Sequence, residues 1–191
     1  MKIKKIKNPF IIAEAGVNHE NNIQIAELLI KEAAQGGASA IKFQTYKAEK
    51  IASKYSPSYW DTKEIKINSQ FKLFKKYDKF NEDDYFKLKK ICDHYKIEFM
   101  STPFDNESAL FLNKIQKFFK IASADITNFP LIEKISKFKK PIIFSTGASN
   151  TTEINNVYKL LINKKIQIGI LHCILSYPTK HKDANLGLIN F

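Results

Sequence analysis

Short apolar runs alternate with amphipathic stretches along this chain, a pattern typical of strands that are each followed by a helix. The apolar runs predict strands at residues 10–13, 38–43, 97–101, 118–121, 141–145 and 166–172. Helices are expected between them, over residues 22–36, 81–95, 108–116 and 128–140, with a last one from residue 151. The first run, Phe10 to Ala13, is unbroken by polar residues and predicts a strand buried on both faces. A repeated order of one strand followed by one helix predicts a parallel α/β architecture.

The region from Thr45 to Asn81 interrupts this alternation with lysine, tyrosine, serine and aspartate residues. Within it, Ser56-Pro57-Ser58 marks a turn. Long connections of this kind usually carry function or cover a site. We therefore expect an insertion that lies above the end of the second strand.

Polar or ionisable residues end the predicted strands. They are Glu14, Lys42 with Gln44, Thr102, Lys120 with Ser123, Ser145-Thr146-Gly147, and His172. Because parallel strands gather their carboxyl ends at one mouth, these side chains are expected to line one pocket. Two lysines with several hydroxyls suit a phosphate or a carboxylate, which predicts an anionic substrate. The alternatives are that the lysines are merely solvated strand ends and that His172 is a buried, hydrogen-bonded imidazole.

Length, charge and cysteine content narrow the class of protein. The chain has 191 residues, 44% of them hydrophobic, and fits one domain. All 31 basic residues are lysines and the net charge is +12, but the lysines are spread along predicted helices, so we expect no nucleic-acid partner. The basic start, residues 1–7, precedes an apolar run too short for a secretory signal or a membrane span. With two separated cysteines, Cys92 and Cys173, the sequence predicts a reduced, cytoplasmic protein without membrane attachment.

Histidines occur singly in this chain and do not form a metal-binding pattern. His19, His94, His172 and His181 make no HxxxH or HxH pair, and no acidic cluster has ligand spacing. The sequence therefore predicts no metal site in this chain.

Taken together, six motifs in this order closely resemble the sialic acid (N-acetylneuraminate) synthase family. The resemblance extends from about Pro9 to Gly187, nearly the whole chain. The motifs are IAEAGVNH from Ile12, KFQT from Lys42, STPF from Ser101, KIASADITN from Lys120, STG from Ser145, and LHC from Leu171 with YPT from Tyr177. They are specific for the family and much less so for which nonulosonic acid is made.

This resemblance implies a (β/α)8 TIM barrel, of which about six β/α units would be present here. It also implies a synthase that joins phosphoenolpyruvate to an N-acylated amino sugar, N-acetylmannosamine or a related one, in surface polysaccharide biosynthesis. Carbon 3 of phosphoenolpyruvate attacks the open-chain aldehyde, and water adds at carbon 2. Phosphate then leaves with C–O cleavage, giving a nine-carbon sialic-acid-type sugar acid.

The resemblance also implies roles for individual residues. Phosphoenolpyruvate would be held by Lys42, Thr102, Lys120, Ser123 and Ser145. The sugar would contact Gln44, Asp125 and Tyr177, with Glu14 close to the reacting centre. Glu14 and Asp125 are the candidates for proton transfer or for holding sugar hydroxyls. Leu175 is a departure, because some members carry at this position an asparagine that contacts phosphoenolpyruvate.

Members of the family use a divalent metal, Mn²⁺ or Mg²⁺, to polarise the aldehyde oxygen. Their two metal-binding histidines lie on segments that would follow Phe191, so the ligands are not expected in this chain. The same holds for the last barrel units and for the C-terminal antifreeze-like domain, which serves the partner subunit in the homodimer. A closed barrel needs roughly 250 residues, so residues 1–191 are interpreted as the N-terminal part of the synthase domain, from a truncated sequence, a split gene or a decayed gene. The alternatives are an inactive sugar-phosphate-binding remnant and another barrel aldolase.

Overall fold

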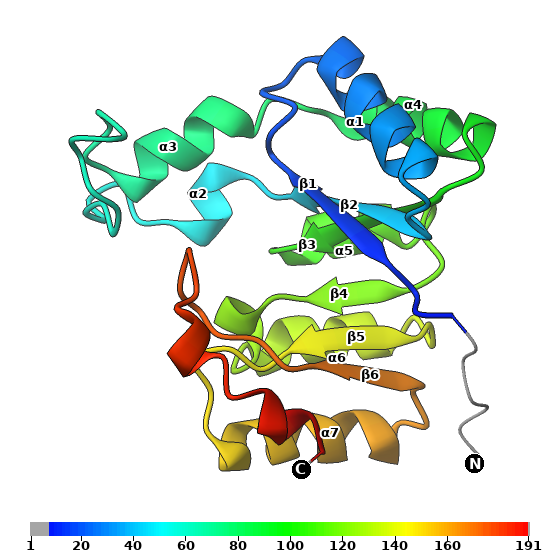
Figure 1. The fold of residues 1–191 in the computed structure, drawn as a ribbon, viewed down its shortest axis with the longest axis vertical. Helices are drawn as coiled ribbons and strands as arrows, with labels where there is room; N and C mark the ends of the chain where they lie inside the picture. The colour runs from blue at the N-terminus through cyan, green and yellow to red at the C-terminus, as the bar shows by residue number, and fades with distance from the viewer. Residues whose placement is uncertain (1–7, 191) are drawn as a thin grey trace.

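The computed structural model describes residues 8–190, and the basic segment 1–7 discussed above lies outside this range (Figure 1). The strands are β1 (Ile12–Gly16), β2 (Ala40–Thr45), β3 (Glu98–Pro103), β4 (Phe119–Ile121), β5 (Ile142–Ser145) and β6 (Ile168–Leu171). The helices are α1 (Ile23–Gln35), α2 (Ala48–Ile51), α3 (Gln70–Tyr77), α4 (Glu82–His94), α5 (Asn106–Leu112), α6 (Phe129–Ser136) and α7 (Thr151–Asn163). Short 3₁₀ turns lie between β4 and α6, at Ser123–Asp125, and after β6, at His181–Asp183 and Leu186–Asn190.

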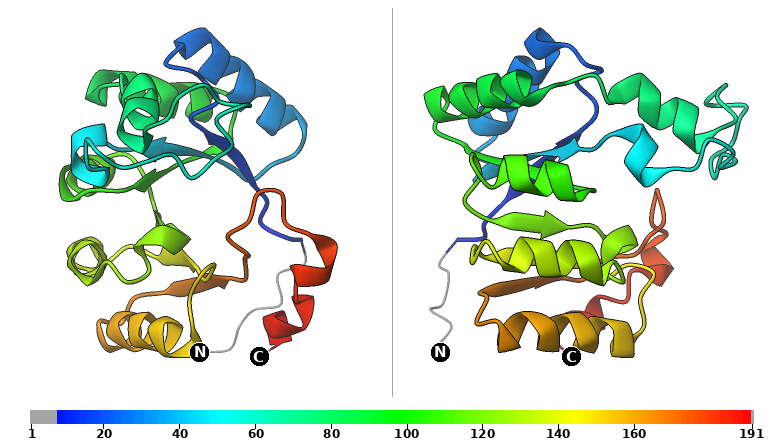
Figure 2. Two further views of the ribbon diagram at one scale, coloured as in Figure 1. Left: turned by 90° about the vertical axis from the view of Figure 1, so that its left-hand side faces the viewer. Right: turned by 180° about the vertical axis from the view of Figure 1, so that it is seen from behind.

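The strands form two parallel three-stranded sheets, in the orders β1-β2-β3 and β4-β5-β6. Figure 2 shows the helices lying around the outside of the strands. Between the sheets, the backbone amide of Ser101 in β3 donates to Oε1 of Gln116 at 2.8 Å. The side chain of Gln116, just before β4, thus takes the place of a backbone carbonyl that a neighbouring strand could otherwise offer to this β3 amide. The predicted parallel α/β class is confirmed, whereas closure into a barrel stays a prediction.

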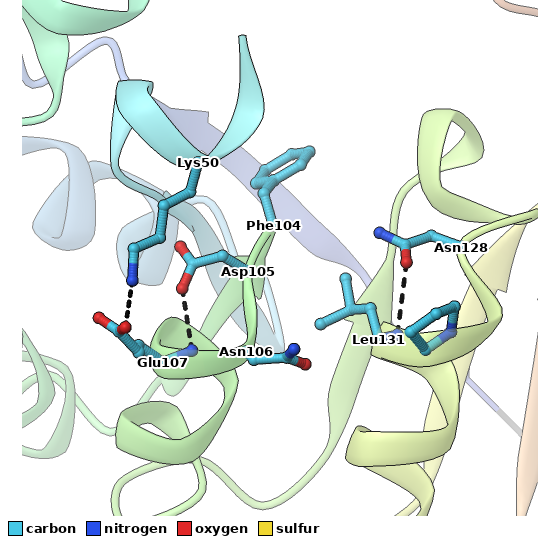
Figure 3. A pocket seen from close by; sticks show the side chains of 8 residues that line it. Lys50, Phe104, Asp105, Asn106, Glu107, Asn128 and Leu131 are labelled. Atoms are coloured by element: carbon cyan, nitrogen blue, oxygen red, sulfur yellow. Dashed lines mark hydrogen bonds and ion pairs between the residues drawn. The ribbon is translucent and has the colours of Figure 1, made fainter.

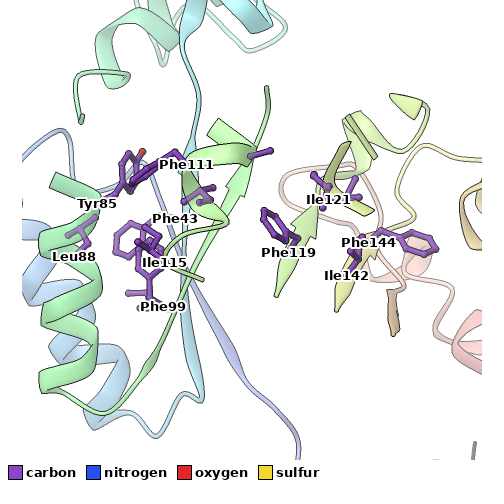
Figure 4. Packing of buried hydrophobic residues seen from close by; sticks show 14 of the residues in the cluster. Phe43, Tyr85, Leu88, Phe99, Phe111, Ile115, Phe119, Ile121, Ile142 and Phe144 are labelled. Atoms are coloured by element: carbon purple, nitrogen blue, oxygen red, sulfur yellow. The ribbon is translucent and has the colours of Figure 1, made fainter. Parts of the chain in front are cut away.

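Alternate residues of each strand face opposite sides, and the two faces differ in chemistry. The helix-facing side holds four phenylalanines that are fully buried, namely Phe43, Phe99, Phe119 and Phe144 (Figure 4). On the inner side, Glu14 is paired with Lys42, and Gln44 with Thr102, in the parallel register. Hydrophobic packing behind each strand therefore points the polar strand-end residues to a shared inner face.

The prediction for the first strand was wrong in its extent. β1 begins at Ile12, and the side chains of Phe10 and Ile11 are each 51% exposed. The parallel register begins at Ile12, opposite Ala40, although the carbonyl of Ile11 already accepts from the backbone amides of Ser39 and Ala40 at 2.8 and 3.1 Å. The apolar run therefore starts two residues before the pairing that buries a strand.

The insertion after β2 is an ordered element that contains α2 and α3. Asp78, near the end of the insertion, holds it against its start. This residue is 8% exposed, and its carboxylate accepts from the backbone amide of Ala48 at 2.9 Å. The ammonium of Lys47 donates to the carbonyls of Asp78 and Phe80, at 3.1 and 3.2 Å. His19 stacks on Phe80 with ring centroids 4.3 Å apart, and burial lowers its pKa to about 4. A neutral imidazole and a buried carboxylate therefore fasten the insertion to the first two β/α units.

No helix within residues 8–190 combines the length and the apolar character that crossing a membrane requires.

Candidate active site

Lys42 and Lys120 lie close enough to influence each other's charge, as the common mouth requires. Lys120 is 7% exposed, and burial, together with the positive charge of Lys42, lowers its pKa to about 8. Its ammonium donates to the carbonyl of Ile121 at 2.7 Å. Because an ammonium carries three donors, Lys120 keeps donors available for a ligand. The structure thus confirms the shared position of the two lysines, while their roles stay predictions.

Glu14 occupies the third corner of this charged group. Its carboxylate forms an ion pair with the ammonium of Lys42, and the Glu14 side chain is 53% exposed. Gly16 and Gln44 lie next to it, because a Cβ on Gly16 would be 3.4 Å from Oε1 of Glu14 and 3.7 Å from Nε2 of Gln44. A carboxylate, an ammonium and an amide therefore share the ends of β1 and β2.

Hydroxyl groups complete this face at the ends of β3, β4 and β5. Thr102 is 2% exposed, and its Oγ1 has no hydrogen-bond partner among residues 8–190. Ser145 is buried at the end of β5. Ser123 begins the 3₁₀ turn after β4. We call Glu14, Lys42, Gln44, Thr102, Lys120, Ser123 and Ser145 the rim.

Asp125 and Tyr177, the two remaining residues of the predicted site, are not part of the rim. Burial raises the pKa of Asp125, although a hydrogen bond from Asn128 Nδ2 to Asp125 Oδ1 at 3.0 Å opposes this. Its other oxygen has no partner within the described part of the chain. Tyr177 is 91% exposed. Figure 1 shows that the segment after β6, which carries Tyr177, lies on the same side as the carboxyl strand ends and the insertion.

The last strand brings Cys173, not His172, to the rim. The ring of His172 is partly buried and bonds the Ala184 carbonyl at 2.7 Å, so it anchors the C-terminal segment as a hydrogen-bonded imidazole. Cys173 instead lies 3.2 Å from the hydroxyl of Ser123 and 3.1 Å from the amide of Gly147. The register explains this placement, because Leu171 is paired with Ser145 and alternation places residue 173 on the same side. Alternation is the part of this signal that the sequence could offer.

Gly147 has no room for a side chain at this point. A Cβ there would be 2.9 Å from Ser123 Oγ, 3.2 Å from Cys173 Sγ and 3.2 Å from the backbone nitrogen of Leu175. We therefore expect Gly147→Ala to lower the free energy of unfolding by about 1–3 kcal/mol through overpacking, measured by urea denaturation. Gly187→Ala is the matched control, because nothing lies within 4 Å of its added Cβ. Equal stability of the two variants would contradict the tight packing.

A cavity of about 430 Å³ lies beside the rim, between α2 and the starts of α5 and α6 (Figure 3). Several of its polar groups already have protein partners. Lys50 forms an ion pair with Glu107, Asp105 caps α5, and Asn128 Oδ1 accepts from the amide of Leu131 at 3.3 Å. The rim, by contrast, holds ammonium and hydroxyl groups with unused hydrogen-bonding capacity. We therefore place the candidate active site at the rim.

A metal site does not form from the described residues. Within residues 8–190, no group of three or more histidine, cysteine, aspartate or glutamate side chains is arranged to hold a metal ion. The residues present therefore do not fit the divalent metal that the family resemblance implies, and no chemical step is assigned to it.

A parallel α/β fold that gathers two lysines, a carboxylate and several hydroxyls at its carboxyl strand ends belongs to the class of α/β proteins that bind ligands at this edge of the strands. Comparison with known proteins identifies the family. The sequence profile of the NeuB family matches residues 29–191, and the chain belongs to this family.

Relatives agree with this assignment. An N,N'-diacetyllegionaminic acid synthase of Campylobacter jejuni is 40% identical over 190 residues, covering 95% of this chain and 56% of that protein. An N-acetylneuraminate-9-phosphate synthase of Drosophila melanogaster is 31% identical and covers 98% of this chain and 51% of that protein. The crystal structure of an N-acetylneuraminic acid synthetase of Leptospira borgpetersenii in complex with citrate has a TM-score of 0.84 and 36% identity. It covers 96% of this chain and 60% of that one. The chain thus spans about half the length of the curated relatives it matches.

Proposed function

We propose that this chain supplies the phosphoenolpyruvate-binding part of a nonulosonate synthase. The reaction would join phosphoenolpyruvate to an N-acylated amino sugar and release phosphate, in surface polysaccharide biosynthesis. The observation that supports the proposal is that Lys42 lies close enough to Lys120 to lower its pKa, and that Thr102, Ser123 and Ser145 come from the ends of the parallel strands that carry or neighbour these lysines. Two cations and rotatable hydroxyls suit a ligand that bears both a phosphate and a carboxylate. The citrate complex of the Leptospira relative supports an anion-binding site in the family.

Binding would rearrange the ion pair at the ends of β1 and β2. Glu14 already gives the Lys42 ammonium an anionic partner. An incoming phosphate or carboxylate would compete for that ammonium, and Glu14 would then be available near the reacting carbon. A carboxylate in this position could take or return a proton as bonds change.

The reaction proposed for the rim begins with a bond between carbon 3 of phosphoenolpyruvate and the aldehyde carbon of the sugar. Water adds at carbon 2 and releases one proton, which balances the proton that the aldehyde oxygen gains. The C–O bond to phosphate then breaks as the new hydroxyl at carbon 2 becomes a ketone, and its proton leaves with phosphate. Asp125 is our candidate for the proton on the sugar side, because burial raises its pKa and its Oδ2 has no partner within residues 8–190. Lys42 and Lys120 would neutralise the phosphate and the carboxylate throughout.

The pH dependence of binding tests this function. Lys120 has a pKa of about 8, so it is largely protonated at pH 7 and largely neutral at pH 9. If the protonated form binds the anion, affinity should fall about tenfold per pH unit above this pKa. We expect titration calorimetry with phosphoenolpyruvate at pH 7, 8, 9 and 9.5 to show that decline.

Lys120→Arg is the matched variant, because a guanidinium keeps its charge over this range. Its affinity at pH 7 need not equal that of the parent chain, but from pH 7 to pH 9 it should lack the decline of about tenfold per pH unit that the lysine causes. A parent chain whose affinity is also flat would refute a charged Lys120 as the anion contact. Undetectable binding at pH 7 would refute the proposed function itself.

Turnover separates the synthase from the remaining alternatives. The chain would be incubated with phosphoenolpyruvate, N-acetylmannosamine and Mn²⁺, and the sugar acid detected with thiobarbiturate. Product together with binding supports the synthase. Binding without product supports a sugar-phosphate-binding remnant, and consumption of another aldehyde supports a different barrel aldolase.

A further inference from the structure

Three groups from three successive strand ends meet beside Lys120. They are the Ser123 hydroxyl after β4, the Gly147 amide after β5 and the Cys173 sulfur after β6. The Gly147 amide donates to Ser123 Oγ and to Cys173 Sγ, both at 3.1 Å. Ser123 Oγ and Cys173 Sγ lie 3.2 Å apart, and either can be the donor. The contacts form a closed triangle that connects three strands.

The hydroxyl of Ser123 has a single proton, so it can donate to one acceptor at a time. If Cys173 is a thiolate, the hydroxyl proton points to sulfur and is lost to any ligand. If Cys173 is a thiol, its S–H can donate to Ser123 Oγ, and the hydroxyl proton is free to point into the rim. The protonation of one residue therefore decides what the other presents to a substrate.

The surroundings of Cys173 favour a change between its thiol and thiolate forms at an accessible pH. Burial raises the pKa of the Cys173 thiol, but hydrogen bonds from Ser123, Gly147, Ser145 and Thr146 together bring it below its ordinary value. The charged groups that face it are Lys120, whose cation favours the thiolate, and beyond it the ion-paired Lys42 and Glu14. The second cysteine, Cys92, is fully buried and its pKa is raised to about 12.

We propose that Cys173 is a positioning residue for anion binding: as a thiol it donates to Ser123 Oγ and directs the serine hydroxyl toward the substrate, and as a thiolate it withdraws that hydroxyl. The inference rests on the proposed function, because Ser123 must contact the substrate anion. It adds a linkage that the function alone does not require. Anion binding and protonation of Cys173 favour each other, and each must strengthen the other by the same factor.

The first test needs no ligand. Alkylation of Cys173 by iodoacetamide would be followed by mass spectrometry from pH 6 to pH 10, with buried Cys92 in the same chain as the unreactive reference. Removing the hydroxyl donor in Ser123→Ala should shift the midpoint of the Cys173 profile to higher pH. Ser149→Ala is the matched control, since its hydroxyl donates to the Gly147 carbonyl at 3.2 Å and not to sulfur. An unchanged midpoint in Ser123→Ala would overturn the proposal.

The second test adds phosphoenolpyruvate. Saturating ligand should move the Cys173 midpoint to higher pH, and titration calorimetry at pH 7 should rank the variants. Cys173→Ser keeps a donor and should bind within about threefold of the parent chain, whereas Cys173→Ala should bind about fivefold more weakly. Cys173→Asp places a permanent anion there and should bind at least about 100-fold more weakly. A serine variant as weak as the alanine variant would leave no role for the donated proton and would overturn the proposal.

Failure of the two proposals can be distinguished. If the parent chain does not bind phosphoenolpyruvate, the proposed function fails, and the Ser123→Ala profile still decides whether the hydroxyl controls the thiol. If the parent chain binds phosphoenolpyruvate and the Cys173 midpoint does not move, the proposed function stands and the linkage is overturned.

Discussion

Replacing Lys120 by methionine is expected to weaken phosphoenolpyruvate binding about 100-fold at pH 7, corresponding to about 3 kcal/mol. Methionine keeps the length and the apolar stem of the side chain, so the change removes the ammonium and little else. The loss should be large because Lys120 is buried, and a hydrogen-bonded charge contributes more there than at an exposed position. Removing the cation would also leave the bound anion with Lys42 alone, which Glu14 already neutralises in part.

Lys159→Met is the control for this result. Lys159 lies on the exposed side of α7, and loss of its charge should change the affinity less than twofold at 0.15 M salt, where exposed distant charges are screened. Both variants would be titrated by calorimetry, with their thermal midpoints measured alongside. Parent-like binding by a folded Lys120→Met chain would remove the main support for an anion site at the rim.

Replacing Phe43 by alanine is expected to lower the free energy of unfolding by about 3–5 kcal/mol. Phe43 is fully buried, and its ring packs against Phe99 and His19, with centroids 5.9 Å away in both contacts. The truncation would remove this apolar contact and leave a cavity between β2 and α4. Because stability of small domains is about 5–15 kcal/mol, a loss of this size is a large part of the total. Urea denaturation followed by circular dichroism would measure it.

The same substitution should also disturb the rim. Lys42 and Gln44 flank Phe43 and point to the opposite face, so their positions depend on how firmly the ring holds β2. Tyr55→Ala is the control, because Tyr55 is 93% exposed in the insertion and its removal should cost less than about 0.5 kcal/mol. A Phe43→Ala chain as stable as the Tyr55→Ala chain would contradict the packing seen in Figure 4.

Local sequence signals predicted most of the helices and strands. The capping boxes of α4 and α7, built from Asn81 with Asp84 and from Asn150 with Glu153, begin those helices close to where the sequence indicated. The helical content of the insertion escaped prediction, because α2 has four residues and α3 has eight. Elements this short are stabilised by tertiary contacts such as the Asp78 cap, which no local pattern reveals.

The candidate site was predictable to the extent that it depends on strand ends and alternation. Lys42, Gln44, Thr102, Lys120 and Ser145 each belong to a strand whose other face is apolar, so burial of that face directs them inward. Cys173 and His172 show the limit of this reasoning. The sequence leaves His172 open between a pocket role and a hydrogen-bonded imidazole, whereas Cys173, the next residue, lies on the side of the alternation that faces the rim.

The periodicity of apolar residues and the contiguous motifs are enough to derive the parallel α/β class, the order of the elements and the family. The contacts between groups from different strands become visible only in three dimensions: the Lys42–Glu14 ion pair, the burial that lowers the Lys120 pKa, and the triangle of Ser123, Gly147 and Cys173. The physical reason is that local patterns act over a few residues, whereas pKa values and hydrogen bonds at the rim depend on atoms contributed by different strands.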